Sequence, residues 1–368
     1  MNEKTVKINL ENYGFSAALF LKEPWGNEPL SSPAGIPARV TAVHRERYAL
    51  VCEYGETWGR LKGKEYYGGL EEYPTVGDLV LADYIDAGDS RIVRTLPRRT
   101  FFSRRDPDPG RQMQAVAANF DYVFIMQSPN QNFSTARLER YLTLGWQSGA
   151  EPVVVLTKAD LLSDYGEYLR AAQRAAAGVQ VHVVSALTGV GMEALSEYMK
   201  PGRTAVFLGS SGVGKSSLVN ALAGEEVMSV GEIRQEDGRG RHTTTHRQFV
   251  MLKSGAMIID TPGMRELGMW DVSEGLGEAF SDVEALLGRC RFRNCRHRTE
   301  PGCAIKEAIE NGALSPGRWE RYQKLKGEAK YSDDKTAYLL KRQKIHKQMA
   351  RMSRQKRTAE RRNRVDGQ

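Results

Sequence analysis

Residues 203–223 of this chain read RTAVFLGSSGVGKSSLVNALA, and this stretch decides the fold. Its middle, Gly209–Ser216, has the pattern G-x-x-x-x-G-K-[ST], in which the backbone N–H groups of a glycine-rich loop surround a phosphate. The apolar, partly β-branched run before the loop predicts a buried parallel strand, and the run after it predicts a helix. In this context Lys215 is predicted to reach the β- and γ-phosphates and Ser216 to bind Mg²⁺. A glycine-rich turn without this role is the alternative, which the complete match disfavours.

Length and composition predict a soluble protein of several domains. At 368 residues the chain exceeds one ordinary hydrophobic core. It contains 40% apolar and 27% charged residues, with no run of eighteen apolar residues. The first residues, MNEKTVK, lack the apolar core of a signal peptide. We therefore expect a cytoplasmic monomer without membrane association.

The excess positive charge lies in a C-terminal tail. Residues 333–368 contain twelve Lys/Arg and four Asp/Glu, a difference of +8 that equals the formal net charge of the whole chain. Such a basic tail commonly contacts nucleic acid, while a solvated helix that only aids solubility is the alternative. Few large apolar residues occur near its end, which predicts disorder or a helix formed only on RNA.

Two regions precede the nucleotide-binding part. Residues 1–35 are predicted to be an N-terminal extension, because Gly, Pro and Ser accumulate toward its end. Residues 36–100 contain five short β-type runs separated by turns, which predict a small closed barrel. An OB-fold is our first choice, and an SH3-like barrel would have the same pattern. Basic and aromatic residues that suit RNA contacts are interleaved at Trp58, Arg60, Lys62, Lys64, Tyr66 and Tyr67.

Two motifs before the phosphate loop point to guanine. Thr157-Lys-Ala-Asp160 follows a predicted strand and is similar to the [NT]-K-x-D motif of GTPases. Its carboxylate can accept from the N1–H and the exocyclic amine of guanine, a donor pair that adenine lacks. Most GTPases have Asn where this chain has Thr157, so the contact that braces the loop is less certain from sequence. Ser185-Ala186 follows the next strand and resembles the motif whose backbone contacts the guanine oxygen.

A second phosphate-sensing segment follows the phosphate loop. Met257–Asp260 is a predicted strand that runs into the D-x-x-G pattern ending at Gly263. Asp260 is predicted to hold Mg²⁺ through water, and the Gly263 N–H to contact the γ-phosphate. Of the threonines in GRGRHTTTH between the two segments, Thr244 is our first choice as a Mg²⁺ ligand and Thr243 the second. A threonine-rich turn without a metal role is the alternative.

These motifs occur in an unusual order, because ordinary GTPases have the phosphate loop first and the guanine motifs last. The same sheet forms if the predicted helix Met192–Tyr198 continues directly to the phosphate-loop strand. Alternating strands and helices over 101–275 therefore predict a circularly permuted P-loop α/β GTPase domain. The residues predicted to bind GTP or GDP are Thr157, Lys158, Ala159, Asp160, Ser185, Ala186, Gly209, Ser210, Ser211, Gly212, Val213, Gly214, Lys215, Ser216, Ser217 and Gly263.

Three of the four cysteines lie close together near the C-terminus. Cys290, Cys295, His297 and Cys303 offer three thiolates and one imidazole, enough for a closed tetrahedral Zn²⁺ site with a structural role. In a reducing cytoplasm a metal is favoured over disulfides, and ordinary buried cysteines are the alternative. Cys52, alone in an apolar run, is predicted to be a core residue. Arginines suited to phosphate surround the cluster at Arg289, Arg291, Arg293, Arg296 and Arg298.

With these motifs in this order, residues 36–325 closely resemble the ribosome small-subunit-dependent GTPase A family, circularly permuted GTPases of late 30S assembly. The resemblance implies a multidomain chain: an N-terminal OB-fold β-barrel (36–100) that binds RNA, the GTPase domain (101–275) with GTP and Mg²⁺, and a C-terminal α-helical zinc-binding domain (276–332). It implies a GTP hydrolase that binds 16S rRNA in the 30S subunit and is released when the small subunit stimulates hydrolysis.

The hydrolytic machinery is expected to be incomplete in the isolated chain. Met264 stands where many small GTPases have a water-orienting glutamine, and a thioether cannot orient water, so slow intrinsic turnover is predicted. His242 matches the histidine that the family is thought to use near the attacking water, and a neutral imidazole could position it. Contact of His242 with rRNA or with its own loop is the alternative. Rival functions are a GTPase of RNA modification or another assembly step, and a nucleotide-gated RNA-binding protein with incidental turnover.

Overall fold

The structure is a computed structural model that describes residues 7–15, 35–44, 47–61, 73–104, 114–228, 248–260 and 272–330. The described residues form two compact units. One contains those up to 260 together with Glu274–Glu284, and the other contains 285–330 with residues 272 and 273. None of the helices in these ranges is long and apolar enough to span a bilayer.

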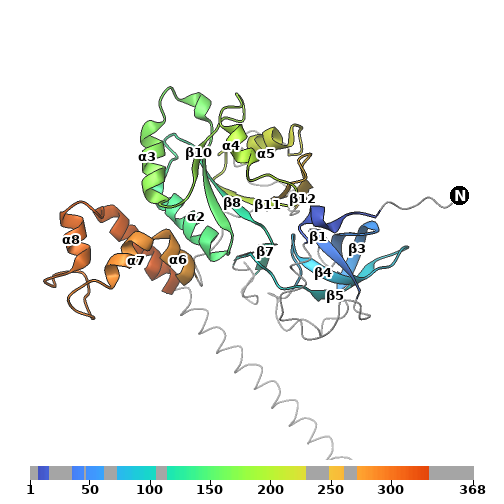
Figure 1. The fold of residues 1–368 in the computed structure, drawn as a ribbon, viewed down its shortest axis with the longest axis horizontal. Coiled ribbons are helices and arrows are strands. Elements are labelled where there is room, and N and C mark those ends of the chain that lie inside the picture. Colours follow the sequence, from blue (N-terminus) through green and yellow to red (C-terminus); the bar gives the residue numbers. More distant parts are fainter. Residues whose placement is uncertain are drawn as a thin grey trace, which may run out of the picture. The chain divides into compact units, whose positions relative to one another are not determined.

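Five strands near the N-terminus close into the predicted barrel (Figure 1). They are β1 (Ile36–His44), β2 (Arg47–Cys52), β3 (Gly55–Leu61), β4 (Leu79–Asp83) and β5 (Ser90–Thr95). Closure results because β4 pairs with both β5 and β1. Strands β3 and β5 run parallel, whereas the other pairs are antiparallel. This closed five-stranded barrel fits the predicted OB-fold, and Cys52 is buried in its core as expected.

A short N-terminal segment packs against the outside of the barrel. The 3₁₀ helix η1 (Leu10–Tyr13) is capped by the Asn9 side chain, which accepts from the Glu11 N–H. Phe15, next to η1, is buried against Leu79 and Leu81 of β4. Because alternate residues of β4 lie in the barrel core, this strand is buried on both faces. Part of the predicted N-terminal extension is therefore packed structure.

A two-stranded sheet joins the barrel to the next domain, where the sequence indicated only a basic connector. It pairs β6 (Phe101–Arg104) with β7 (Gln114–Ala118). The pairing is anchored by aromatic packing, since the Phe102 and Phe120 rings stack with their centroids 4.9 Å apart. The Thr100 hydroxyl also donates to the Phe120 carbonyl over 2.7 Å. Because basic residues surround strand β6, the sequence pattern did not predict this strand.

The central domain is the predicted doubly wound α/β fold, with helices on both faces of its sheet (Figure 1). Its strands follow the order β10-β9-β8-β11-β13-β12, and all neighbours except β12–β13 are parallel. In Figure 1, helices α2 and α3 lie on one side of this sheet and α4 and α5 on the other. The elements are β8 (Tyr122–Gln127), α2 (Thr135–Gln147), β9 (Glu151–Leu156), α3 (Gly166–Ala175), β10 (Val181–Val183), α4 (Met192–Ser196), β11 (Thr204–Gly209), α5 (Lys215–Ala223), β12 (Gln248–Met251) and β13 (Met257–Asp260).

The barrel and the central domain share one continuous sheet. Strand β12 pairs with β13 along its length, and its residue Gln248 also pairs with Ala42 of β1 in the barrel. The sequence did not predict β12 or this junction.

The C-terminal part is helical. It contains α6 (Ser273–Ala279), α7 (Ser281–Leu287), α8 (Ala304–Glu310) and a further helix over residues 316–330. Residues of α8 and of the last helix, including Ile305, Tyr322 and Leu325, are buried. The predicted α-helical C-terminal region is therefore confirmed, while the sequence had not indicated α6 or α7.

Candidate nucleotide site and metal centre

The predicted nucleotide-binding segments meet at one edge of the central sheet. Strands β9, β11 and β13 are parallel to β8 or to each other, so their carboxyl ends share this edge. The Thr157 motif follows β9, the phosphate loop follows β11, and Asp260 ends β13. Ser185 comes shortly after the neighbouring parallel strand β10. Four segments that are distant in sequence thus surround one site.

The phosphate loop has the open backbone that an anion site needs. Gly212 and Gly214 have φ angles of 69° and 100°, in the left-handed region that favours glycine. At Gly209 an added Cβ would lie 2.9 Å from the Val213 side chain and 3.1 Å from Met126 Cβ. Helix α5 begins directly after this loop, which places its unpaired N–H groups and its positive dipole end at the site.

A cation and an anion lie side by side where a phosphate and its metal ion would bind. The Lys215 ammonium forms an ion pair with the Asp260 carboxylate. Lys215 starts α5 and Asp260 ends β13, so the pair joins the phosphate loop to the D-x-x-G segment. An ammonium suits phosphate oxygens and a carboxylate suits Mg²⁺. Ser216, the other predicted Mg²⁺ ligand, is the next residue of α5.

The first guanine motif is tied directly to the phosphate loop. The Thr157 hydroxyl lies 2.6 Å from the Val213 carbonyl and 3.3 Å from the Gln127 carbonyl, within hydrogen-bonding distance of both. The Lys158 ammonium donates to the Gly212 carbonyl over 2.7 Å. Lys158 has a φ angle of 58°, an uncommon left-handed conformation for a side-chain-bearing residue. Threonine therefore makes the bracing contact that the sequence left uncertain.

The second guanine motif orients the first. The Ser185 hydroxyl donates to the Asp160 carboxylate, and the Thr188 N–H donates to the Ser185 oxygen over 3.2 Å. Ser185 is buried, whereas Asp160 is exposed at the rim. Gly191 closes this loop with a φ angle of 71°, and an added Cβ would lie only 2.1 Å from the Val183 carbonyl. The carboxylate predicted to read guanine is thus held by a buried hydroxyl.

A cavity of about 380 Å³ lies between these motifs and the phosphate loop. This volume is within the range typical of small-ligand sites. Its walls include both guanine motifs and the first turn of α5, through Thr157, Lys158, Asp160, Ala186, Gly214 and Ser217.

Several predicted residues lie outside the described ranges. These are His242, Thr243, Thr244, Gly263 and Met264, together with Lys62, Lys64, Tyr66, Tyr67 and the tail 333–368. Their roles stay predictions.

The C-terminal unit brings together the four predicted metal ligands. The Sγ atoms of Cys290 and Cys303 each lie 3.5 Å from His297 Nδ1, and the four ligand atoms, with that of Cys295, all lie within 4.8 Å of one another. Tetrahedral Zn²⁺, with Zn–S of about 2.3 Å and Zn–N of about 2.05 Å, has sulfur–nitrogen edges of about 3.6 Å. The cluster therefore fits a tetrahedral metal ion.

The surroundings of the cluster affect the thiol of Cys295 and the ring of His297. Burial, followed by hydrogen bonds with the neighbouring thiols, raises the pKa of Cys295 to about 11. At neutral pH this thiol keeps its proton unless a cation such as a metal ion stabilises the thiolate. The His297 ring packs edge-on against Trp319, with centroids 5.4 Å apart.

Glu300 organises the loop that carries the predicted metal ligands, and the sequence did not single it out. Its carboxylate accepts from the backbone N–H groups of Arg296, Arg298 and Thr299, at 2.9, 2.9 and 3.0 Å. These bonds lower the pKa of Glu300 to about 2. A single acid just after the run of arginines was the available signal.

A phosphate loop in the middle of the chain, guanine motifs before it and the D-x-x-G strand after it define a circularly permuted P-loop GTPase. The RsgA GTPase family model matches residues 95–270. The chain belongs to this RsgA GTPase family. An ABC transporter model also matches residues 192–362, a range that contains the phosphate loop shared by many nucleotide-binding families.

Relatives extend the likeness beyond the GTPase domain. The chain is 44% identical over 335 residues to a protein of Listeria innocua named small ribosomal subunit biogenesis GTPase RsgA 1, covering 91% of this chain and 93% of that protein. It is similar in structure to YjeQ from Thermotoga maritima, with a TM-score of 0.60 and 28% identity over 79% of this chain and 96% of the other. YloQ, described as a circularly permuted GTPase, shares the fold with a TM-score of 0.55 and 23% identity, covering 82% and 98%.

Proposed function

We propose that this GTPase acts as a late-stage assembly and maturation factor of the 30S ribosomal subunit. The observation that carries the proposal is 44% identity over nearly the full length to a protein named for small-subunit biogenesis. The three parts implied by the resemblance, 36–100, 101–275 and 276–332, then serve as rRNA-binding barrel, GTPase and zinc domain. In this proposal the chain works as a cytoplasmic monomer.

Different residues of the site are proposed to bind the base, the phosphates and the metal ion of GTP. Asp160, held by Ser185, reads the guanine, and Lys215 neutralises the phosphates. Ser216 and Asp260 would hold Mg²⁺, with Thr244 as a further ligand, and the Gly263 N–H would contact the γ-phosphate. When bound, Mg²⁺ supplies positive charge against the phosphate oxygens.

The catalytic step needs help from a partner. His242 is proposed to orient the attacking water, a task for which Met264 has no hydrogen-bonding group. We therefore expect the isolated chain to hydrolyse GTP slowly and the chain bound to the small subunit to hydrolyse it faster. A His242→Ala variant is expected to lose the stimulated turnover and to keep its nucleotide affinity.

One face of the barrel has the chemistry to bind single-stranded rRNA. Trp58 is 39% exposed on β3, and the Arg47 guanidinium lies 4.8 Å from its ring centroid. The His44 ring packs edge-on against the same indole at 5.4 Å. Arg47 and Arg60 both form ion pairs with Asp89. An exposed aromatic flanked by arginines can stack a base and pair with its phosphate.

The metal centre and its surroundings are proposed to form a second rRNA contact. Cys290, Cys295, His297 and Cys303 would hold one structural Zn²⁺. Phe292, 42% exposed, lies in the same loop with the Arg291 guanidinium 5.6 Å from its ring centroid. The positive charge of the basic tail would add binding to RNA phosphates that does not depend on the RNA sequence.

Sedimentation with purified 30S subunits tests this proposal. The full chain should pellet with 30S subunits in a non-hydrolysable GTP analogue and much less in GDP. Trp58→Ala should weaken binding by about tenfold, as expected for one stacked base. Tyr54→Ala is the matched control, because Tyr54 is equally exposed but pairs with Tyr84. Equal pelleting in both nucleotides, or with 50S subunits, would contradict the proposal.

A further inference from the structure

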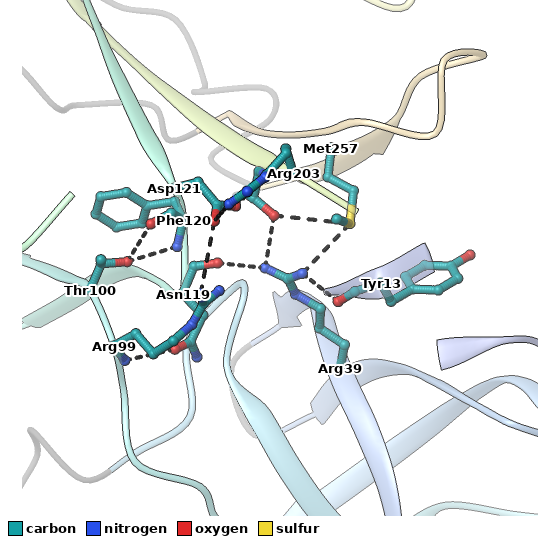
Figure 2. Close-up of polar contacts among 10 residues, drawn as sticks. Tyr13, Arg39, Arg99, Thr100, Asn119, Phe120, Asp121, Arg203 and Met257 are labelled. Atoms are coloured by element: carbon teal, nitrogen blue, oxygen red, sulfur yellow. Dashed lines mark hydrogen bonds and ion pairs between the residues drawn. The ribbon is translucent and has the colours of Figure 1, made fainter. Parts of the chain in front are cut away.

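Arg39 is a barrel residue whose side chain leaves the barrel and is buried against the GTPase domain (Figure 2). Its neighbours on β1, Ala38 and Val40, lie in the barrel core. Since side chains alternate along a strand, Arg39 projects from the opposite face. It is only 1% exposed.

The guanidinium contacts four separate segments. Nη1 donates to the Tyr13 carbonyl over 2.5 Å and lies 3.6 Å from Met257 Sδ. Nη2 donates to the Asn119 carbonyl over 2.8 Å and to the Thr204 hydroxyl over 3.1 Å. Thr204 is the first residue of β11, which leads to the phosphate loop, and Met257 is the first residue of β13, which leads to Asp260. One side chain therefore holds the starts of both nucleotide-binding strands.

A fifth contact comes from the strand between the barrel and β13. The Arg39 guanidinium lies 5.0 Å from the ring centroid of Phe249 on β12. A buried guanidinium over an aromatic face is a favourable cation–π arrangement. The side chain is thus enclosed by elements of the N-terminal segment, the barrel and the GTPase sheet.

The charge of Arg39 is retained in this buried place. Burial lowers its pKa to about 10, so it stays a cation at neutral pH. Its hydrogen-bond acceptors are neutral, and no described residue hydrogen-bonds to its Nε. A buried cation without a directly paired carboxylate is unfavourable for packing alone. This points to a role in fixing one particular arrangement of the two domains.

The same strand reaches the nucleotide site through the sheet. Ala42, three residues after Arg39, pairs with Gln248 of β12, and Gln248 pairs with Asp260 of β13. Adjacent strands are about 4.8 Å apart, so the barrel backbone is only about 10 Å from the backbone of Asp260. Asp260 in turn pairs with Lys215 of the phosphate loop. Movement of β13 at its phosphate-sensing end would therefore act on β1.

We propose that Arg39 is a positioning residue that locks the barrel to β11 and β13, so that the nucleotide and the barrel control each other. Any ligand that favours the barrel arrangement of one nucleotide state over that of the other must then change the preference for GTP over GDP. By thermodynamic linkage, the nucleotide changes the affinity for that ligand by the same factor. This inference needs the GTPase activity of the family and is independent of the ribosomal role.

Nucleotide binding by variants of the full chain tests the coupling. Arg39→Met keeps a long apolar side chain without the charge, and Thr204→Val removes one of its partners. Arg91→Met is the matched control, because Arg91 is an exposed arginine on strand β5 of the barrel. The measurements are the ratio of dissociation constants for a fluorescent non-hydrolysable GTP analogue and for GDP, and hydrogen exchange of residues 36–44 with each nucleotide.

For Arg39→Met we expect the ratio to change by about fivefold or more. Thr204→Val should change it less but in the same direction, and Arg91→Met should leave it unchanged. In the wild type, exchange of residues 36–44 should differ between the two nucleotides, and Arg39→Met should abolish that difference. A purely structural role would lower stability and leave the ratio unchanged. The inference is overturned if neither Arg39→Met nor Thr204→Val changes the ratio. It is also overturned if hydrogen exchange of residues 36–44 in the wild type is the same with both nucleotides. If Arg39→Met does not fold, the ratio of dissociation constants measured for Thr204→Val tests the inference alone.

Discussion

The Thr157 hydroxyl lies 2.6 Å from the Val213 carbonyl, which links the guanine motif to the phosphate loop across 56 residues of sequence. Both residues are buried, so the acceptor has no ready replacement in solvent. The two halves of the predicted nucleotide site, one expected to bind the base and one the phosphates, are thereby held as one preformed unit. Lys158 reinforces the same junction through Gly212.

Replacing this hydroxyl should loosen the nucleotide site. Thr157→Val keeps the shape of the side chain but leaves the Val213 carbonyl without its donor, a change worth about 1–2 kcal/mol. We expect GTP and GDP affinities to fall by about five- to thirtyfold, as measured by fluorescent nucleotide titration. Thr57→Val on the barrel is the control. Affinity within twofold of wild type would show that the loop does not depend on this bond.

Asp160 should decide which base is accepted. Asp160→Ala removes the carboxylate that Ser185 orients and leaves the other contacts of the site in place. GTP affinity is expected to fall by about a hundredfold or more, because the guanine donors lose their acceptor, while weak ATP binding changes little. Competition titrations with the two nucleotides measure this. An equal loss for GTP and ATP would assign Asp160 a structural role instead.

The metal centre should be essential to the C-terminal unit and separable from nucleotide binding. Cys303→Ala removes the buried ligand of the cluster and is expected to reduce bound zinc from one equivalent to well under half. The helices around it should unfold at lower temperature, while GDP affinity is preserved. Cys52→Ala, at the one cysteine outside the cluster, should keep full zinc content. Full zinc occupancy in Cys303→Ala by elemental analysis would refute the assignment.

Glu300 should hold the metal loop in place in a pH-dependent manner. Its carboxylate has a pKa lowered to about 2 by three backbone N–H groups, against an ordinary 4.5. The stabilisation is therefore complete above pH 4.5 and is lost as the pH falls toward 2. Glu300→Gln should release zinc to a chelator several times faster at neutral pH, with Glu310→Gln as the control. Identical release rates would contradict this role.

The features that sequence predicted best are those that local chemistry determines. The phosphate loop from Gly209 to Ser216 needs its glycines and its lysine in fixed positions, so the pattern and the function coincide. The spacing of Cys290, Cys295, His297 and Cys303 predicted a four-ligand cluster for the same reason. The five barrel strands followed from short β-type runs between turns.

The features that sequence did not predict depend on contacts between distant residues. Arg39 occupies a position on β1 that strand alternation assigns to the outside of the barrel, and its partners lie as far as 218 residues away. Strand β12 is short and gains its role by pairing with both β13 and β1. No local pattern distinguishes such residues from ordinary surface positions.

Steady-state GTP turnover with and without purified 30S subunits tests the central claim most directly. The account predicts slow hydrolysis by the chain alone and a rate at least about tenfold higher with 30S subunits, since the partner completes the catalytic arrangement. Equimolar 50S subunits should leave the rate unchanged. The same rate with and without 30S subunits, or stimulation by unrelated RNA to the same degree, would contradict it.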